Sequence, residues 1–230
     1  VIMSPAMVTS GLTKKVPYDI FKDFTNVMQF GHYTHCLASL SDSPWKDLKG
    51  MVEWGKKNPG KLTISGPGPG GIPHLCAVKF ADVADVGMKY VPFKGGAPAV
   101  AALLGGHVLA YSGPPAFWPH VKTGKVNFLG VYAEKRVAGY PDVPTAQQVG
   151  YEVVGKAPIG ISAPAGLPEE VRITIRDAFR KAMEDPKVIE LTENWLMPLE
   201  YKDGPEYDKT VKWMWDNYGA LTESIGLRKK

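Results

Sequence analysis

Lys61-Leu-Thr-Ile-Ser65, followed at once by Gly66-Pro-Gly-Pro-Gly-Gly71, is the stretch that decides the fold. A short run with alternating apolar residues is typical of a strand, and clustered glycine and proline are typical of a turn. Pro73 suits the first turn of a helix, and apolar residues continue at helical spacing as far as Phe80. The stretch therefore predicts a strand, a turn and a helix in succession.

The same order repeats along the middle of the chain. Residues 88–91 read as a strand, Gly95-Gly-Ala-Pro98 as a turn, and residues 99–104 as a helix of small side chains that ends at Gly105. Further strands are expected at residues 107–111, 126–131 and 160–162. Repeated strand–turn–helix units predict an α/β fold with mainly parallel sheets.

The last third of the chain reads as helical. Glu169 and Glu170 open an amphipathic segment, and a second short helix is expected to follow Pro186 and to run to about Leu196. After Gly204-Pro205, apolar residues recur at steps of three and four: Tyr207, Val211, Met214, Tyr218, Leu221 and Ile225. That spacing predicts one long helix with a single core-facing stripe.

Composition argues against nucleic-acid binding and against a membrane-spanning segment. The 230 residues carry 27 Lys and Arg against 23 Asp and Glu, a net charge of +4 without a basic block. Nucleic acid is therefore not expected as a partner. The longest apolar run, residues 97–104, is far shorter than the roughly 20 residues that span a bilayer. Cys36 and Cys76 can form one bridge or remain two buried thiols.

Catalytic and cofactor motifs do not emerge. Gly66, Gly68 and Gly71 match a dinucleotide-binding spacing, but the acidic residue expected about 20 positions later is absent. His32 and His35 would face opposite sides of a strand, so they do not form a metal pair. We therefore predict no catalytic residue, no metal site and no cofactor.

Two glycine-rich turns are better candidates for binding. Both follow a strand and precede a helix, so in a parallel sheet both would lie at the carboxyl edge, where open α/β folds bind ligands. Their bare backbone N–H groups and the helix N-termini behind them suit an anion, and Lys94 lies in the second turn. The alternative is that the glycines serve backbone geometry alone.

The longest distinctive stretch carries a family resemblance. Tyr90-Val-Pro-Phe-Lys-Gly-Gly-Ala-Pro-Ala-Val-Ala-Ala-Leu-Leu-Gly-Gly-His-Val108 resembles the most characteristic segment of the tripartite tricarboxylate transporter substrate-binding proteins, the Bug or TctC-like family. Asn58-Pro-Gly-Lys-Leu62 and Tyr140-Pro-Asp-Val-Pro-Thr145 fall in the family's order and spacing. The resemblance covers nearly the whole chain.

The resemblance implies a two-lobed periplasmic binding protein fold, type II-like. The first lobe would comprise residues 1–33 and 156–230, and the second residues 34–155. Such a protein is a periplasmic, monomeric solute receptor that closes by hinge motion on a small organic carboxylate in the interlobe cleft. It delivers the carboxylate to membrane permease subunits. A ligand sensor that acts through a signalling partner is the alternative, and an α/β enzyme is a more distant one.

The resemblance also implies that the first lobe is incomplete at its N-terminal side. The family's early Pro-Ala-Gly-Gly loop would lie ahead of Val1, and the first residues would form a mid-lobe strand that ends near the cleft at Ser4. The residues expected to bind ligand come from this strand end, from the two glycine turns and from the following strand: Ser4, Pro5, Gly68, Gly70, Gly71, Ile72, Phe93, Lys94, Gly95 and Ser112.

Departures from the family pattern bear on the ligand. Ser112-Gly-Pro114 stands where the family often has an acidic residue that orients an amino or hydroxyl group. Several aromatic residues are expected around the cleft, the alternative being that some of these rings belong to the core: Tyr33, Phe93, Tyr111, Phe117 and Trp118. Together these features favour an aromatic or aliphatic carboxylate over an amino acid or citrate.

Overall fold

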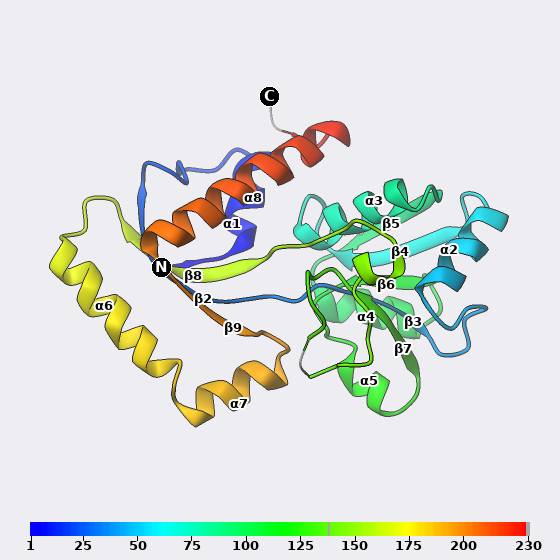
Figure 1. Cartoon of the computed structure of the whole chain (residues 1–230). Coiled ribbons are helices and arrows are strands. Elements are labelled where there is room, and N and C mark those ends of the chain that lie inside the picture. The colour runs from blue at the N-terminus through cyan, green and yellow to red at the C-terminus, as the bar shows by residue number, and fades with distance from the viewer. Residues whose placement is uncertain (138, 229–230) are drawn as a thin grey trace. The chain divides into compact units, whose positions relative to one another are not determined.

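The structure, a computed structural model, describes residues 1–137 and 139–228, with the side chain of Asn194 left out. The chain divides into two compact units (Figure 1). Unit 1 comprises residues 1–33 and 156–230, and unit 2 comprises residues 34–155. Unit 2 is thus inserted into unit 1 between β2 (Phe24–His32) and β8 (Pro158–Pro164).

Unit 1 contains a four-stranded sheet in the order β1-β8-β2-β9. Its elements beside β2 and β8 are β1 (Ile2–Met3), α1 (Pro5–Thr13), α6 (Glu169–Ala182), α7 (Pro186–Asn194), β9 (Leu199–Asp203) and α8 (Gly204–Ser224). Every pairing in this sheet is antiparallel. The prediction of mainly parallel sheets is therefore wrong for unit 1. The reason is that β8 is the returning strand: it runs back beside β2, which leads out of the unit, and beside β1.

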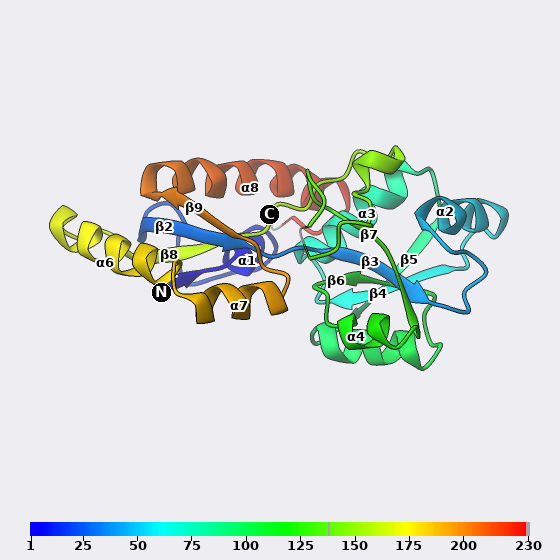
Figure 2. The same ribbon diagram turned by 60° about the horizontal axis from the view of Figure 1, so that its bottom comes forward.

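Helix α8 covers one face of this sheet together with α1 (Figures 1 and 2). The Asp203 carboxylate caps α8 by accepting from the Glu206 N–H at 2.9 Å. The expected apolar stripe is confirmed from Tyr207 to Tyr218, because Tyr207, Val211, Met214 and Tyr218 are all buried. The Tyr207 hydroxyl donates to the Met3 carbonyl at 3.0 Å and ties the helix to β1.

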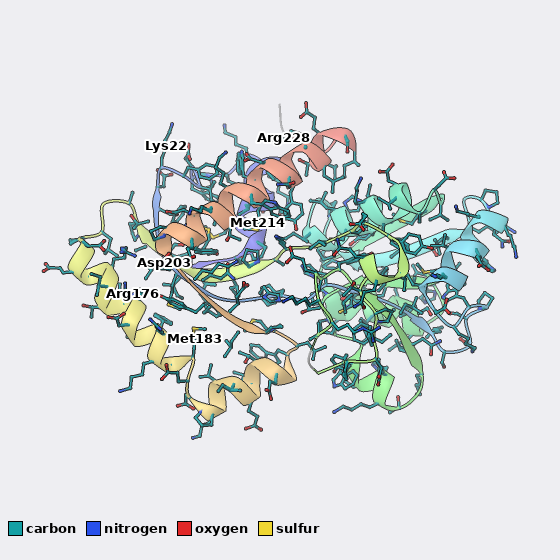
Figure 3. The ribbon with its side chains drawn as sticks, viewed as in Figure 1. Lys22, Arg176, Met183, Asp203, Met214 and Arg228 are labelled. Carbon is teal, nitrogen blue, oxygen red and sulfur yellow. The ribbon has the colours of Figure 1, made fainter. Side chains whose placement is uncertain are left out.

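Helix α6 makes a weaker layer on the same sheet. It holds the expected acids in its first turn, yet none of its residues is buried. Ile175 and Met183 are half-buried against a cluster centred on Met28 and Ile161, and Figure 3 shows Met183 on the side of α6 that faces the strands. The amphipathic helix predicted here forms, but its apolar stripe remains partly exposed.

Unit 2 contains a five-stranded sheet in the order β5-β4-β6-β3-β7. Strands β4 and β5 pair in parallel, as do β4 and β6, whereas β3 runs antiparallel to both β6 and β7. Its elements in chain order are β3 (Cys36–Leu40), α2 (Leu48–Lys57), β4 (Leu62–Pro67), α3 (Ile72–Val83), β5 (Met88–Phe93), α4 (Gly96–Leu104), β6 (Ala110–Gly113), α5 (Trp118–Lys122), β7 (Val126–Val131) and a 3-10 turn, η1 (Gln147–Val149).

Helices cover both faces of the unit 2 sheet. Figure 2 shows α2 and α3 on one side of the strands and α4 on the other. Phe80 of α3 and Leu103 of α4 are both fully buried, each on its own side of the sheet. The strand–turn–helix units predicted from the sequence therefore form a three-layer unit, with helices on both faces of one sheet.

Candidate functional site

The carboxyl ends of three parallel strands define one edge of the unit 2 sheet. Strand β4 ends at Pro67, β5 at Phe93 and β6 at Gly113. Pro67 pairs with Phe93 in the β4–β5 register, so the strands end level with each other. The loops that follow the three strands therefore leave the sheet from the same edge, which we call the glycine edge (residues 66–71, 93–96 and 112–114).

The two glycine turns touch at this edge. The Gly68 N–H donates to the Phe93 carbonyl at 2.9 Å, and the Tyr90 hydroxyl donates to the Pro67 carbonyl at 3.1 Å. The structure thus brings together the two turns that the sequence placed 27 residues apart at Gly68 and Gly95.

Two of the expected backbone donors are already engaged. Gly68 donates to Phe93, and the Gly70 N–H donates to Nδ1 of His74 at 3.1 Å. The His74 ring lies against that of Tyr90, with ring centroids 4.3 Å apart. Burial lowers the pKa of His74, which favours the neutral ring that accepts this hydrogen bond. These contacts hold the turn rigid rather than leaving every amide free.

Free donors remain at the two helix N-termini. Helix α3 begins at Ile72 after Gly71, and α4 begins at Gly96 after Gly95. The first N–H groups of a helix have no partner within that helix. In the described ranges no hydrogen bond from the N–H of Gly71, Ile72, Gly95 or Gly96 is found. The N-termini of α3 and α4, which carry partial positive charge, therefore lie at the glycine edge together with these unpaired N–H groups.

Ser112 holds the glycine edge together. Its side chain is fully buried, and its hydroxyl donates to the Pro73 carbonyl at 2.9 Å, which joins β6 to the first turn of α3. Next to it, a Cβ added to Gly66 would lie 2.3 Å from the Ser112 carbonyl oxygen and 2.2 Å from the Tyr90 hydroxyl oxygen. Ser112 is therefore placed to position the turn, and its hydroxyl is already used.

Phe93 and Lys94 differ in exposure. Phe93 is half-buried and packs against the cluster beneath α4, whereas Lys94 is exposed. The Lys94 side chain is on the loop that precedes the N-terminus of α4. An anion bound there would be stabilised by the lysine charge and by the partial positive charge of the helix end.

The expectation about aromatic residues is wrong for two of them. Tyr111 and Phe117 are fully buried and pack edge to face, with centroids 5.6 Å apart. The Tyr111 hydroxyl donates to the Pro114 carbonyl at 2.7 Å. They fill the core beneath α4, because Tyr111 points inward from β6. Trp118 packs on Tyr140, with centroids 4.2 Å apart, and Tyr33 is 36% exposed.

Ser4 and Pro5 belong to unit 1. They form the junction between β1 and α1, with Pro5 buried in the first turn of the helix. The Ser4 carbonyl accepts from the Met7 N–H at 3.0 Å, and its side chain makes no capping hydrogen bond. This junction is again a strand end followed by a helix N-terminus.

The cysteines and the histidines show no metal or redox chemistry. Cys36 and Cys76 are both free and buried, which decides between the two readings left open by the sequence. Burial raises the pKa of both thiols, so they are inert at neutral pH. Across residues 1–137 and 139–228 no group of three or more His, Cys, Asp or Glu could hold a metal ion. Within the same residues no helix is long and apolar enough to cross a membrane.

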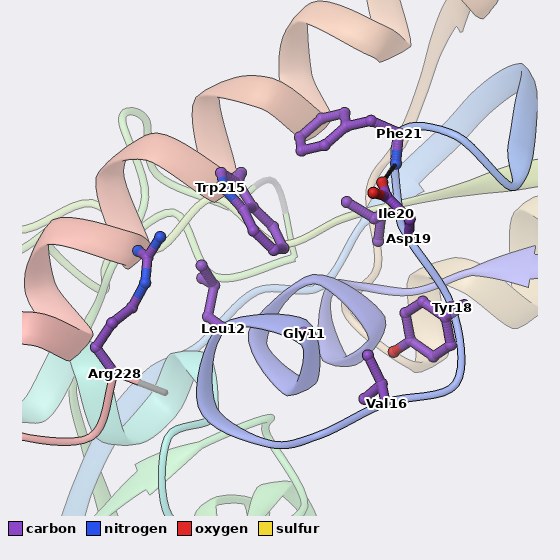
Figure 4. Close-up of a pocket in the computed structure, with 9 residues that line it drawn as sticks. All are labelled: Gly11, Leu12, Val16, Tyr18, Asp19, Ile20, Phe21, Trp215 and Arg228. Carbon is purple, nitrogen blue, oxygen red and sulfur yellow. Dashed lines mark hydrogen bonds between the residues drawn. The ribbon is translucent and has the colours of Figure 1, made fainter. Parts of the chain in front are cut away.

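Unit 1 has a hollow of about 400 Å³ between α1, the following loop and α8 (Figure 4). Phe21 and Trp215 meet edge to face there, with centroids 5.4 Å apart, and Arg228 lies over the Trp215 ring. The Asp19 carboxylate accepts from the Phe21 N–H at 2.9 Å, so it stabilises the loop to which it belongs. None of the residues expected to bind ligand lines this hollow.

His74 and Tyr90 contact the glycine turn, although the sequence pattern does not assign them to it. The His74 ring accepts a hydrogen bond from the Gly70 N–H. The signal was its position in the first turn of α3, four residues after Gly70, from which a side chain can reach back to the turn.

Comparison with known proteins identifies the family. The model of the Tripartite tricarboxylate transporter family receptor matches residues 1–227. The chain belongs to this family. It is 33% identical over 217 residues to the "UPF0065 protein in gbd 5'region" of Cupriavidus necator, a match that covers 94% of this chain. At 66%, the chain spans just under two thirds of that relative's own length.

Solved structures agree with the family assignment. The periplasmic binding protein BugD superposes with a TM-score of 0.85 at 25% identity, covering 100% of this chain and 78% of that chain. A structure titled "R. palustris Rpa4515 with adipate" superposes with a TM-score of 0.87 at 20% identity, covering 98% of this chain and 77% of that chain, and it shows the shared fold. The fold is therefore that of a periplasmic binding protein, and the family model and the solved relative BugD describe receptors.

Proposed function

We propose that this receptor binds a small organic carboxylate at the glycine edge of unit 2 and delivers it to the membrane permease subunits of a tripartite tricarboxylate-type transporter. Units 1 and 2 would act as two lobes that close on the carboxylate, and the junction at Ser4 and Pro5 would contribute from unit 1. The observation that carries the proposal is the contact between Gly68 and Phe93, which sets two helix N-termini at one sheet edge.

The chemistry of the edge suits a carboxylate. The N–H groups of Gly71, Ile72, Gly95 and Gly96 supply donors at positive helix ends, and Lys94 adds a full charge. A receptor needs these contacts to be reversible, and backbone donors bind an anion without transforming it. A structural relative described with bound adipate supports an aliphatic dicarboxylate as the first ligand to test.

The ligand is tested by calorimetry on the protein produced from its complete gene, with adipate, malate and benzoate as probes. We expect one of them to bind and to raise the unfolding temperature, because a ligand at 100 times its Kd stabilises the native state by about 2.7 kcal/mol. If no mono- or dicarboxylate binds, the proposed ligand class is wrong.

The location is tested with Gly71→Val. A Cβ at Gly71 meets nothing closer than 3.7 Å, so the fold should accept the side chain while the donors behind it become obstructed. Gly87→Val, at the turn before β5 and with its closest contact at 3.5 Å, is the matched control. Binding that survives in Gly71→Val would remove the glycine edge from the site.

The charge is tested with Lys94→Met. Losing one cation next to the carboxylate should weaken binding about tenfold, which corresponds to about 1.4 kcal/mol. Lys89→Met, within strand β5 and also exposed, should leave the affinity unchanged. Equal effects of the two substitutions would show that only the overall charge matters.

A further inference from the structure

The hollow between α1, the following loop and α8 has the size and the lining of a small-molecule site (Figure 4). Its volume is about 400 Å³, and such sites are concave and mostly apolar, with a few polar groups. The apolar side chains that line it are Leu12, Val16, Ile20, Phe21 and Trp215. Because Phe21 is 50% exposed, part of its ring surface is available to a ligand.

Two helical glycines make room for the groups that line the hollow. In α1, a Cβ added to Gly11 would lie 3.0 Å from the Trp215 ring. In α8, a Cβ added to Gly219 would collide with the Arg228 guanidinium. Glycine inside a helix costs about 1 kcal/mol relative to alanine. The close packing of Trp215 and Arg228 therefore accounts for two residues that helix formation alone disfavours.

Arg228 supplies a cation to the hollow. Its backbone N–H donates to the Thr222 carbonyl at 2.9 Å, and its guanidinium lies over the Trp215 ring, 5.8 Å from the ring centroid. Among residues 1–137 and 139–228, no carboxylate forms an ion pair with this guanidinium. A planar guanidinium without an acidic partner suits a ligand carboxylate, which it can bind with two parallel hydrogen bonds.

Asp19 also lines the hollow, but its charge is already engaged. Its carboxylate accepts from the N–H groups of Phe21 and Lys22 at 2.9 and 3.2 Å, and it lies 3.7 Å from the Lys22 ammonium nitrogen. A cationic group of a ligand would have to compete with Lys22 for Asp19. The hollow therefore favours a ligand that carries a negative charge and no positive one.

We propose that this hollow is a binding site for a small aromatic carboxylate, separate from the glycine edge. The aromatic ring of the ligand would pack against Phe21, Trp215 and the aliphatic side chains, and its carboxylate would accept N–H groups of Arg228. Aromatic rings pack favourably edge to face, which the two protein rings already do with each other. An inorganic anion would use the arginine alone and leave the apolar lining unfilled.

The test uses phenylacetate as the probe and the protein produced from its complete gene with Gly71→Val, so that the glycine edge is obstructed. We expect phenylacetate to bind by calorimetry and to shift the indole N–H signal of Trp215 in NMR spectra, assigned with Trp215→Phe. The uncharged 2-phenylethanol should bind at least about tenfold more weakly. Phenylalanine should also bind more weakly, because its ammonium group must compete with Lys22 for Asp19.

Gly219→Ala separates the role of Arg228 in binding from a role in folding. The added Cβ collides only with the flexible end of Arg228, so the guanidinium must move while the helix gains propensity. We expect the affinity for phenylacetate to fall at least about tenfold without a drop in the unfolding temperature, and Arg228→Met to weaken binding as much. Lys209→Met removes an exposed charge from the same helix, does not alter the lining of the hollow, and should leave the affinity unchanged.

Four results would overturn the proposal. Phenylacetate fails to bind to the Gly71→Val protein, so that any binding to the wild type belongs to the glycine edge. The Trp215 indole signal stays in place while other signals move. Gly219→Ala and Lys209→Met change the affinity equally. Phenylalanine or 2-phenylethanol binds as tightly as phenylacetate.

Discussion

The two faces of the unit 1 sheet differ in how deeply their helices are buried. The unit 2 sheet, by contrast, has helices with buried residues on both faces. On one face α8 buries Tyr207, Val211, Met214 and Tyr218, while on the other α6 buries none of its residues. Both helices are amphipathic by sequence. An apolar stripe at helical spacing therefore identifies a helix and the side it would bury, but not whether a partner is present to bury it.

The largest expected effect tests this contrast within unit 1. Met214→Ala removes a fully buried side chain from the covered face and should cost about 3 kcal/mol of unfolding free energy. Phe179→Ala removes a larger but largely exposed side chain from α6 and should cost less than about 1 kcal/mol. Urea denaturation of both variants measures the two costs. Equal costs would mean that the two faces are equally packed.

A smaller effect is expected at the glycine edge of unit 2. Gly66→Ala places a Cβ 2.2 Å from the Tyr90 hydroxyl oxygen and 2.3 Å from the Ser112 carbonyl oxygen, so β4 or β6 must shift. The cost should be about 2 kcal/mol. Gly71→Ala, in the same loop but with contacts no closer than 3.7 Å, is the control and should be nearly neutral. If Gly66→Ala left the unfolding free energy unchanged, unit 2 would accommodate the added Cβ more easily than its packing indicates.

The last effect concerns the interior of unit 2 and depends on pH; between pH 7 and pH 5 it should remain below about 2 kcal/mol. Burial lowers the pKa of His35 to about 4, below its ordinary value of 6.5. The unfolded chain therefore binds a proton at higher pH than the folded chain does. The resulting stability is present above about pH 6.5 and is lost, by up to about 1.4 kcal/mol per pH unit, as the pH falls toward 4.

The measurement is the unfolding free energy between pH 7 and pH 5, compared between the wild type and His35→Gln. The variant should lose the part of the slope that comes from His35. Burial also lowers the pKa of His74, which adds a slope of the same sign in this range and is retained in the variant. The Glu200 pKa, lowered to about 2 by His32 and Lys202, acts mainly at lower pH. An unchanged slope in His35→Gln would show that this ring is not the buried titrating group.

Much of unit 2 could be predicted because its signals are local. The strand at Val126–Val131 lies at the predicted residues, and β4 and β5 begin within one residue of their predicted starts. The strand expected at residues 107–111 begins instead at Ala110, because the His107 N–H bonds back to Ala102 and prolongs the turn after α4. Glycine and proline signals mark a turn better than they mark the residue at which pairing resumes.

Unit 1 was harder to predict because its central strand carries polar side chains. Asn26 and Gln29 interrupt the apolar pattern of β2, and each donates to a distant residue: Asn26 to Asp208 at 2.8 Å and Gln29 to Glu200 at 2.7 Å. The antiparallel pairing follows from the chain leaving and returning, which local patterns do not encode.

In the candidate site, too, local sequence signals predict some features and tertiary packing sets others. The meeting of the two glycine turns could be inferred, because parallel strands share a carboxyl edge. The engagement of Gly68 by Phe93 and of Ser112 by Pro73 could not, since these partners are set by tertiary packing. The Gly70–His74 contact is local, and its four-residue spacing is a sequence signal. The sequence therefore predicts the shared edge correctly, but it overestimates how many of the backbone N–H groups there are free to bind a ligand.

The backbone of Tyr132 ties down both ends of unit 2. Its N–H donates to the His35 carbonyl at 2.9 Å, and its carbonyl accepts from the Gly155 N–H at 2.9 Å. The first and last residues of the insertion are thus held beside one another. A polypeptide with neighbouring ends can be cut out, expressed alone or circularly permuted with a short linker. Unit 2 is therefore a module that protein engineers could transplant.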